Sequence, residues 1–180
     1  MPAATVILLR LFDPFPPAAA NVGGFVTQLN TDDAVFDGTA HPILVPASGT
    51  NFSDWASFQL DATANPDGHT LDNIRVYSDG TDSLGTGVGA VIATAPTYLQ
   101  ATEQAVGDGT ELNTTNYPAL AAAPVDFFGF TSAAPLAVPG STSGNGLFGD
   151  IIVLQVTVDP TAAGGMTPQE MLRVVYDEHA

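Results

Sequence analysis

The chain has 180 residues, of which 45% are hydrophobic, so it is long enough to form one domain with a sizeable core. Its 19 acidic residues stand against three arginines and no lysine, which gives a formal net charge of -16. Because nucleic acids and anionic membranes attract basic surfaces, this charge excludes both as expected partners. No cysteine is present, which excludes disulfides and thiolate metal sites.

Charged residues make up only 12% of the chain, against about 25% in an ordinary globular protein. Ser, Thr, Asn, Gly and Pro supply most of the polar surface instead. Because long Lys and Glu side chains are scarce, such a surface loses little conformational entropy when it forms a contact. The composition therefore favours a protein that makes lasting contacts with a neighbouring surface.

The chain opens with Met1-Pro2-Ala3-Ala4 and passes directly into an apolar run at residues 5–12. A secretory leader would place a basic segment before such a run and a small-residue cleavage site after it. Here no positive charge precedes the run, and Arg10 lies inside it. We therefore expect synthesis in the cytoplasm without a signal peptide. No apolar run approaches the roughly 18 residues that a membrane-spanning helix needs.

Short runs rich in Val, Ile, Phe, Tyr and Thr are separated by dipeptides such as Asp67-Gly68 and Asn145-Gly146. These dipeptides supply the positive φ values of tight hairpin turns. Many short strands at fairly regular spacing predict an all-β fold, a single antiparallel β-sandwich of Ig-like or jelly-roll type. The predicted strands lie at residues 4–12, 24–29, 42–46, 52–62, 71–78, 88–93, 125–131, 150–159 and 171–177.

Both faces of the first predicted strand are apolar apart from Arg10. Either both faces are covered within the monomer, or one of them docks on a neighbouring subunit. Since few charged residues keep copies apart, the pattern favours the second arrangement, a homo-oligomer or a lattice contact. The candidate interface residues are Val6, Leu8, Arg10 and Phe12, and the opposite face carries Ile7, Leu9 and Leu11.

Only one segment indicates a helix. Residues 96–106 begin with a proline and have apolar residues at roughly helical spacing, and Gly107 follows at the position of a C-cap. At most one short helix is therefore expected. Residues 113–149 contain Ala-Pro pieces and a Ser- and Gly-rich stretch, which predicts a long loop excursion within a single domain of residues 1–180.

The aspartates allow a second interpretation besides that of ordinary turn formers. Some flank one predicted turn and others the next, so that their oxygens would converge on Ca²⁺ at one end of the sandwich. EF-hand spacing is absent, because Gly68 is the eighth residue from the first aspartate where that loop requires glycine at the sixth. The alternative is that no cofactor is bound. The candidate ligands are Asp61, Asp67, Asp72, Asp79 and Asp82.

The residues typical of catalysis do not form a recognisable group. His41, His69 and His179 are far apart and are interpreted as turn residues. Residues 85–90 match the G-x-G-x-x-A pattern, but they lack the preceding buried strand and following helix of a dinucleotide site. Trp55 is interpreted as a core aromatic residue between two sheets and not as a sugar-binding side chain. We therefore predict that the protein is not an enzyme.

The clearest predicted strand is at residues 150–159. Ile152 and Leu154 begin one continuous apolar face, whereas the opposite face becomes polar towards Gln155 and Thr157. This alternation predicts that one face lies in the core. We expect the strand to form a closing hairpin with residues 171–177.

The pattern Val156-x-Val158-x-Pro160, followed by Ala162, Gly165 and a returning strand, resembles the closing hairpin of Ig-like sandwiches in bacterial, archaeal and phage surface proteins. Taken whole, the chain resembles structural proteins of tailed viruses of bacteria or archaea, above all capsid decoration proteins. The resemblance implies a non-enzymatic subunit of the virion surface, which packs against copies of itself or a major capsid protein lattice. The alternative is an exported adhesin or a carbohydrate-binding sandwich module.

Overall fold

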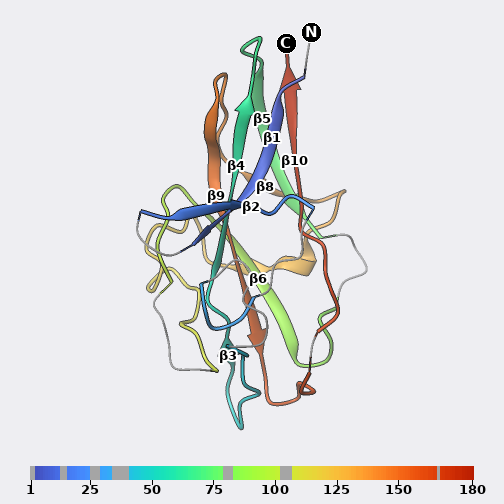
Figure 1. The fold of residues 1–180 in the computed structure, drawn as a ribbon. Helices are drawn as coiled ribbons and strands as arrows, with labels where there is room; N and C mark the ends of the chain where they lie inside the picture. The colour runs from blue at the N-terminus through green and yellow to red at the C-terminus, as the bar shows by residue number, and fades with distance from the viewer. Residues whose placement is uncertain are drawn as a thin grey trace.

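The computed structural model describes residues 3–12, 16–24, 29–33, 41–78, 83–101, 107–165 and 167–180. These residues form antiparallel β-sheets and contain no α-helix, which confirms the predicted all-β class. The molecule is elongated, with β4 and β9 running along most of its length (Figure 1). The start of β1 and the end of β10 lie at the same end of the molecule.

The larger sheet has β9 at its centre. Its strand order is β2-β1-β4-β9-β6-β7, and β3 also pairs with β9. All of these neighbouring pairs are antiparallel. The strands are β1 (Thr5–Phe12), β2 (Ala18–Asn21), β3 (Asn51–Phe52), β4 (Ala56–Ala64), β6 (Val88–Ala95), β7 (Val125–Asp126) and β9 (Gly146–Val158).

The smaller sheet has the order β10-β5-β8 and packs against the larger one. Its strands are β5 (Thr70–Tyr77), β8 (Leu136–Val138) and β10 (Arg173–His179). β5 buries Leu71, Ile74 and Val76, which join a core cluster with apolar side chains of β4, β6 and β9. Leu71 and Ile74 are three residues apart and still share this face, because β5 bulges at Asn73, whose φ is 47°. Two facing sheets with a shared apolar core are the arrangement of a β-sandwich.

A second core cluster lies on the opposite face of the larger sheet. Residues 96–101 and 107–124 fold over this face and pack on Ile151 and Val153 of β9. We call them the covering segment. Trp55 and Tyr117 lie in this cluster with their ring centroids 5.5 Å apart, and the Trp55 indole N–H donates to the carbonyl of Leu99 at 3.0 Å. Trp55 is thus a core aromatic residue as predicted, but it lies between a sheet and this covering segment and not between the two sheets.

The prediction that β9 has one core face and one polar face is wrong. Because the covering segment occupies its second side, Gln155 is fully buried there. The Gln155 Oε1 accepts from the amide of Leu112 at 2.7 Å, and its Nε2 donates to the carbonyls of Ser53 and Thr110 at 2.7 and 2.8 Å. The buried amide therefore satisfies backbone groups of the covering segment and of the connection between β3 and β4.

The predicted hairpin between residues 150–159 and 171–177 is also wrong. A strand has two hydrogen-bonding edges, and those of β9 are occupied by β3 and β4 on one side and by β6 on the other. The last strand instead pairs with β5 in the smaller sheet, from Arg173 opposite Tyr77 to His179 opposite Thr70. Its register shifts between Val175 and Asp177, which marks a β-bulge.

Three other predicted strands differ from the structure. Residues 42–46 form no strand, and residues 52–62 are interrupted between β3 and β4. The segment 125–131 contains only the two-residue β7 before the 3₁₀-helix η1 (Phe127–Gly129), because the Asp126 carboxylate accepts from the Phe128 amide at 3.1 Å and caps the turn. The strands β2 and β8 were not predicted.

The remaining predictions fall partly outside the described residues. Of the strand predicted at 24–29, residues 25–28 are not among them, and of the helix predicted at 96–106, residues 102–106 are not. Residues 96–101 are irregular. The excursion predicted at 113–149 contains β7, η1, β8 and the first residues of β9, so it is not a single loop.

Two glycine backbones cross at the junction of β8 and β9. Gly140 has a φ of 112°, and a Cβ on it would lie 2.6 Å from the Cα of Gly149. Gly149 has a φ of 72°. Both glycines are required here, because a side chain at Gly140 would meet backbone atoms and both φ values lie in the left-handed region.

Candidate functional site

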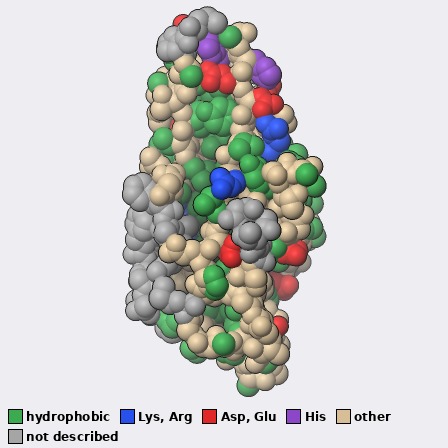
Figure 2. Space-filling model, turned by 90° about the vertical axis from the view of Figure 1, so that its right-hand side faces the viewer, with side chains coloured by type: hydrophobic (Ala, Val, Ile, Leu, Met, Phe, Trp, Pro, Cys, Tyr) green, Lys and Arg blue, Asp and Glu red, His purple; other side chains and the backbone are tan. Residues whose placement is uncertain are grey.

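Histidine and acidic side chains gather at the end of the molecule where β1 begins and β10 ends (Figure 2). The antiparallel pairing of β10 with β5 places the last residues of β10 beside the turn between β4 and β5. We call this end the tip. Its residues are Asp67, His69, Asp72, Asp177, Glu178 and His179.

On the inner side of the tip, Glu178 joins three segments of the chain. Its Oε1 accepts from the Ala4 amide before β1 at 2.9 Å and lies 2.6 Å from Nδ1 of His69. The Ala4 amide and His69 lower the pKa of the Glu178 carboxyl, so it is ionised at neutral pH. Because an ionised carboxylate can only accept hydrogen bonds, Nδ1 of His69 must be the donor.

His69 is held in place by its backbone. Asn65 accepts from the His69 amide at 3.0 Å and donates to the His69 carbonyl at 2.7 Å. Only 8% of the His69 side chain is exposed, and its Nε2 is shielded from solvent without a hydrogen-bond partner among the described residues. A carboxylate oxygen of Asp67 lies 4.0 Å from this nitrogen.

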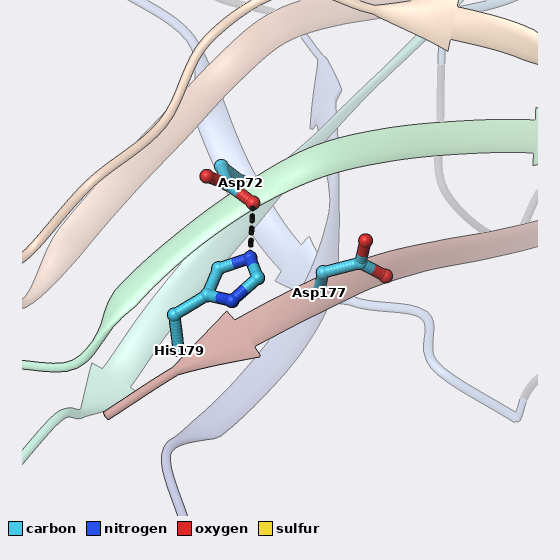
Figure 3. A group of neighbouring side chains, drawn as sticks. All are labelled: Asp72, Asp177 and His179. Atoms are coloured by element: carbon cyan, nitrogen blue, oxygen red, sulfur yellow. Dashed lines mark hydrogen bonds and ion pairs between the residues drawn. The ribbon is translucent and has the colours of Figure 1, made fainter.

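On the outer side of the tip, Asp72, Asp177 and His179 offer ligand atoms that lie within 4.8 Å of one another. The His179 ring of β10 turns towards Asp72 of β5, with Nε2 3.1 Å from the carboxylate (Figure 3). Asn73 donates to Asp177 at 2.6 Å and the Arg75 guanidinium pairs with it. These two residues lower the pKa of the Asp177 carboxyl, and the cluster is a surface ion-pair network.

The structure does not assemble the predicted calcium ligands. Asp61 lies on β4 of the larger sheet, Asp67 lies in the turn after β4, and Asp72 lies on β5 of the smaller sheet. The described residues hold no group in which these three meet. Asp79 and Asp82 lie outside the described residues.

The sequence-based prediction did not include the three residues of β10 that contact Asp72 and His69 at the tip. Asp177, Glu178 and His179 come to the tip only because β10 pairs with β5, whereas the sequence suggested pairing with residues 150–159. The dense run of titratable groups Asp-Glu-His near the end of an otherwise weakly charged chain was the available signal.

The structure places the candidate interface residues of β1 inside the fold. Arg10 is 2% exposed, pairs with Asp33 at 2.7 Å and stacks over the Phe58 ring at 5.5 Å. Val6, Leu8 and Phe12 are partly buried against the core between the sheets. All four side chains are thus largely covered by the chain itself.

The opposite face of β1 is more open. Ile7 lies opposite Asp61 of β4, and Asp61 lies opposite Leu147 of β9, so one row crosses three strands. Leu147 is 55% exposed, and the other two are half-buried. We call this half of the larger sheet, beyond the covering segment, the open face. Its residues are Thr5, Ile7, Gln59, Asp61 and Leu147.

Two hollows lie near the other end of the larger sheet. One, of about 330 Å³, contains Asp159 as its single carboxylate beside Gly87 and Gly89. The other, of about 310 Å³, has the aromatic residue Phe52 and the polar residues Glu111 and Asn113 in its lining. An aromatic ring with hydrogen-bonding groups beside it suits a small polar ligand such as a sugar.

No helix in the part of the chain that the structure describes is long and apolar enough to cross a membrane. A scan against protein-family models and searches of curated proteins and of solved structures found no match to this chain.

Proposed function

We propose that this chain is a non-enzymatic structural subunit of a virus particle, a capsid decoration or accessory protein that binds the capsid lattice from outside. The observation that carries the proposal is the open face, where Ile7, Asp61 and Leu147 form one row across three strands. A half-apolar sheet face of this kind is suited to cover a matching surface.

The charge of the chain favours a lattice as partner over a second copy. Asp61 lies in the middle of the row, and every copy carries a formal charge of -16. Two copies that met through this face would bring like charges together, which disfavours the contact. A neutral or basic capsid surface has no such penalty. Self-association through the same face is the other form that the proposal allows.

The composition supports the same function. Charged residues are 12% of the chain, so few flexible side chains must be ordered at a contact. The two hollows near the far end of the larger sheet are each lined by a single carboxylate, Asp159 or Glu111, and by no histidine. Such hollows lack the paired acid and base of a hydrolytic site.

Particle composition tests the proposal. Mass spectrometry of purified particles from the source should find the chain at high stoichiometry, and electron microscopy should place it on the outer surface. A Leu147→Asp variant should fold and fail to join particles. The matched control is Val125→Asp, because Val125 lies on the edge strand β7 and is 46% exposed. This variant should still join particles. Recovery of the chain only as a soluble host protein would contradict the proposal.

A second candidate function is sugar binding at the hollow beside Phe52. The observation in its favour is the lining, which combines an aromatic residue with two polar ones. A pyranose would stack on Phe52, and Glu111 and Asn113 would bind its hydroxyl groups. A glycan array with the purified chain tests it. Binding that Phe52→Ala abolishes would favour an adhesin or carbohydrate-binding module over the capsid subunit.

A further inference from the structure

We propose that the inner side of the tip binds a Zn²⁺ ion through Nε2 of His69 and the carboxylate of Asp67, while Glu178 orients the imidazole. The proposal does not depend on the function proposed above. It starts from a buried nitrogen for which the described residues provide no hydrogen-bond partner.

The contact of Nδ1 leaves Nε2 as the ring atom that faces a metal. Nδ1 lies 2.6 Å from the Glu178 carboxylate, and the tautomer in which Nδ1 donates to that carboxylate has its lone pair on Nε2. A buried polar atom without a hydrogen-bond partner is unfavourable, and an ion is one of the explanations such an atom calls for. A histidine whose other nitrogen donates to a carboxylate is the usual form of a metal-bound histidine.

The position of Asp67 fits a shared ion better than a hydrogen bond. Its oxygen lies 4.0 Å from Nε2, which is too long for a hydrogen bond. Zinc binds nitrogen and oxygen at about 2.0–2.2 Å, so a tetrahedral ion would hold the two atoms roughly 3.4 Å apart. The Asp67 side chain is 38% exposed in a turn, and it needs to move by only about 0.6 Å.

The surrounding residues fix the rest of the site. Asn65 clamps the His69 backbone on both its amide and its carbonyl, so the ring is held before an ion arrives. The exposed side of Asp67 leaves water to complete the coordination. A nitrogen ligand selects zinc over calcium, which prefers oxygen ligands throughout. The outer cluster is separate, because Arg75 already pairs with Asp177 there.

Titration of the tag-free, EDTA-treated full chain with ZnCl₂ tests the proposal. Isothermal titration calorimetry should show saturable binding, and Tm should rise with the same saturation. In ¹⁵N NMR spectra the Nε2 resonance of His69 should shift while Nδ1 stays protonated. CaCl₂ at equal concentration should give neither the shift nor the saturable rise.

Matched variants locate the ion. Asp67→Asn keeps a turn-forming residue and should weaken zinc binding about tenfold or more, and Glu178→Gln should weaken it by a similar factor. His69→Gln should abolish binding, and Asp67→Asn tests the site even if the His69 variant does not fold. His179→Gln, on the outer side of the same strand, should bind zinc with unchanged affinity.

Four results would overturn the proposal. One is an absence of heat and of NMR shift at millimolar zinc, and another is unchanged affinity in Asp67→Asn. A third is loss of binding only in His179→Gln, which would place the ion on the outer cluster. The fourth is a protonated Nε2 at neutral pH with zinc present, because the ring would then be an imidazolium paired with both carboxylates.

Discussion

The covered part of the larger sheet and the tip are stabilised by different physical interactions. Around Trp55, Tyr117 and Gln155, both faces of the sheet are covered, and apolar packing with amide and hydroxyl hydrogen bonds dominates, with the buried Arg10–Asp33 pair beside it. At the tip, the contacts are between histidines and carboxylates that are mostly half-exposed. Burial of apolar area and neutral hydrogen bonds are insensitive to pH, whereas the tip depends on protonation and is screened by salt. The first region therefore provides stability, and the second can respond to conditions.

The largest expected effect is in the core shared by the two sheets. Leu154→Asp places an unpaired charge where the side chain is 8% exposed, and it should lower the free energy of unfolding by about 4 kcal/mol. Urea unfolding followed by circular dichroism measures the loss. Leu147→Asp on the same strand, at a side chain 55% exposed, is the control and should cost little. Equal midpoints for the two variants would contradict the assignment of the core.

The next largest loss of stability is expected at the buried Gln155 side chain of the covered region. Gln155→Leu leaves the Leu112 amide and the carbonyls of Ser53 and Thr110 without their partner, which should cost about 3 kcal/mol. Hydrogen exchange should show the Leu112 amide losing protection. Gln59→Leu, which removes a single bond of 2.7 Å to the Gly149 carbonyl at a half-buried site, should cost clearly less. A variant at Gln155 as stable as the parent would show that the covering segment does not depend on it.

The crossing of β8 and β9 provides a third test. Gly140→Ala adds a Cβ that would lie 2.6 Å from backbone at a φ of 112°, so we expect a cost of about 2 kcal/mol or more. Gly144→Ala in the same connection meets nothing within 4 Å and should be near neutral. Thermal unfolding of the two variants under identical conditions measures the difference, which should vanish if the two backbones do not cross closely.

The smallest effect sharpens the contrast in pH dependence. Asn73 and Arg75 lower the folded-state pKa of Asp177, so its contribution is present above the ordinary carboxyl pKa of 3.8 and is lost as the pH falls through the folded value. Burial instead raises the pKa of Asp150 in β9, so its ionisation opposes folding at neutral pH. Asp177→Asn should therefore reduce stability at pH 7 and not at the acid end.

The matched substitution has the opposite sign. Asp150→Asn should raise stability at pH 7 and change little at low pH, because the raised folded-state pKa makes the charged form unfavourable. Urea unfolding from pH 7 down to pH 3 measures both curves. Parallel curves for the two variants would mean that the two carboxylates do not lie in different environments.

Local pattern was enough to predict the fold class and the strands with the clearest alternation. The runs that became β1, β5, β6 and β9 combine β-branched residues with turn dipeptides at their ends, and these signals act over a few residues. Trp55 could be assigned to a core because large aromatic side chains are rarely left in water. The short strands β2 and β8 carry little signal, since Ala18–Asn21 and Leu136–Val138 are set by their pairing partners.

The candidate site could not be predicted because it depends on pairing between distant strands. No local feature of the sequence shows whether the strand with Glu178 pairs with residues 150–159 or with β5. Only the second pairing brings Glu178 to His69, which is 109 residues away in sequence. The face of β1 that is open was equally hidden, since both faces are apolar and the choice between them depends on the covering segment. The polar Gln155 appeared to mark a solvent face because its three backbone partners lie on other segments.

The β-bulge between β5 and β10 affects how copies of this chain can meet. β10 is an edge strand, and an unprotected edge strand is a template on which other chains add strands and aggregate. The bulge on the neighbouring strand β5, where Asn73 and Ile74 lie opposite a single residue of β10, increases the twist beside that edge, and the charged run from Asp177 to His179 occupies its end. Open-ended sheet extension is thereby disfavoured. A contact through a flat sheet face, by contrast, adds no strand to either sheet.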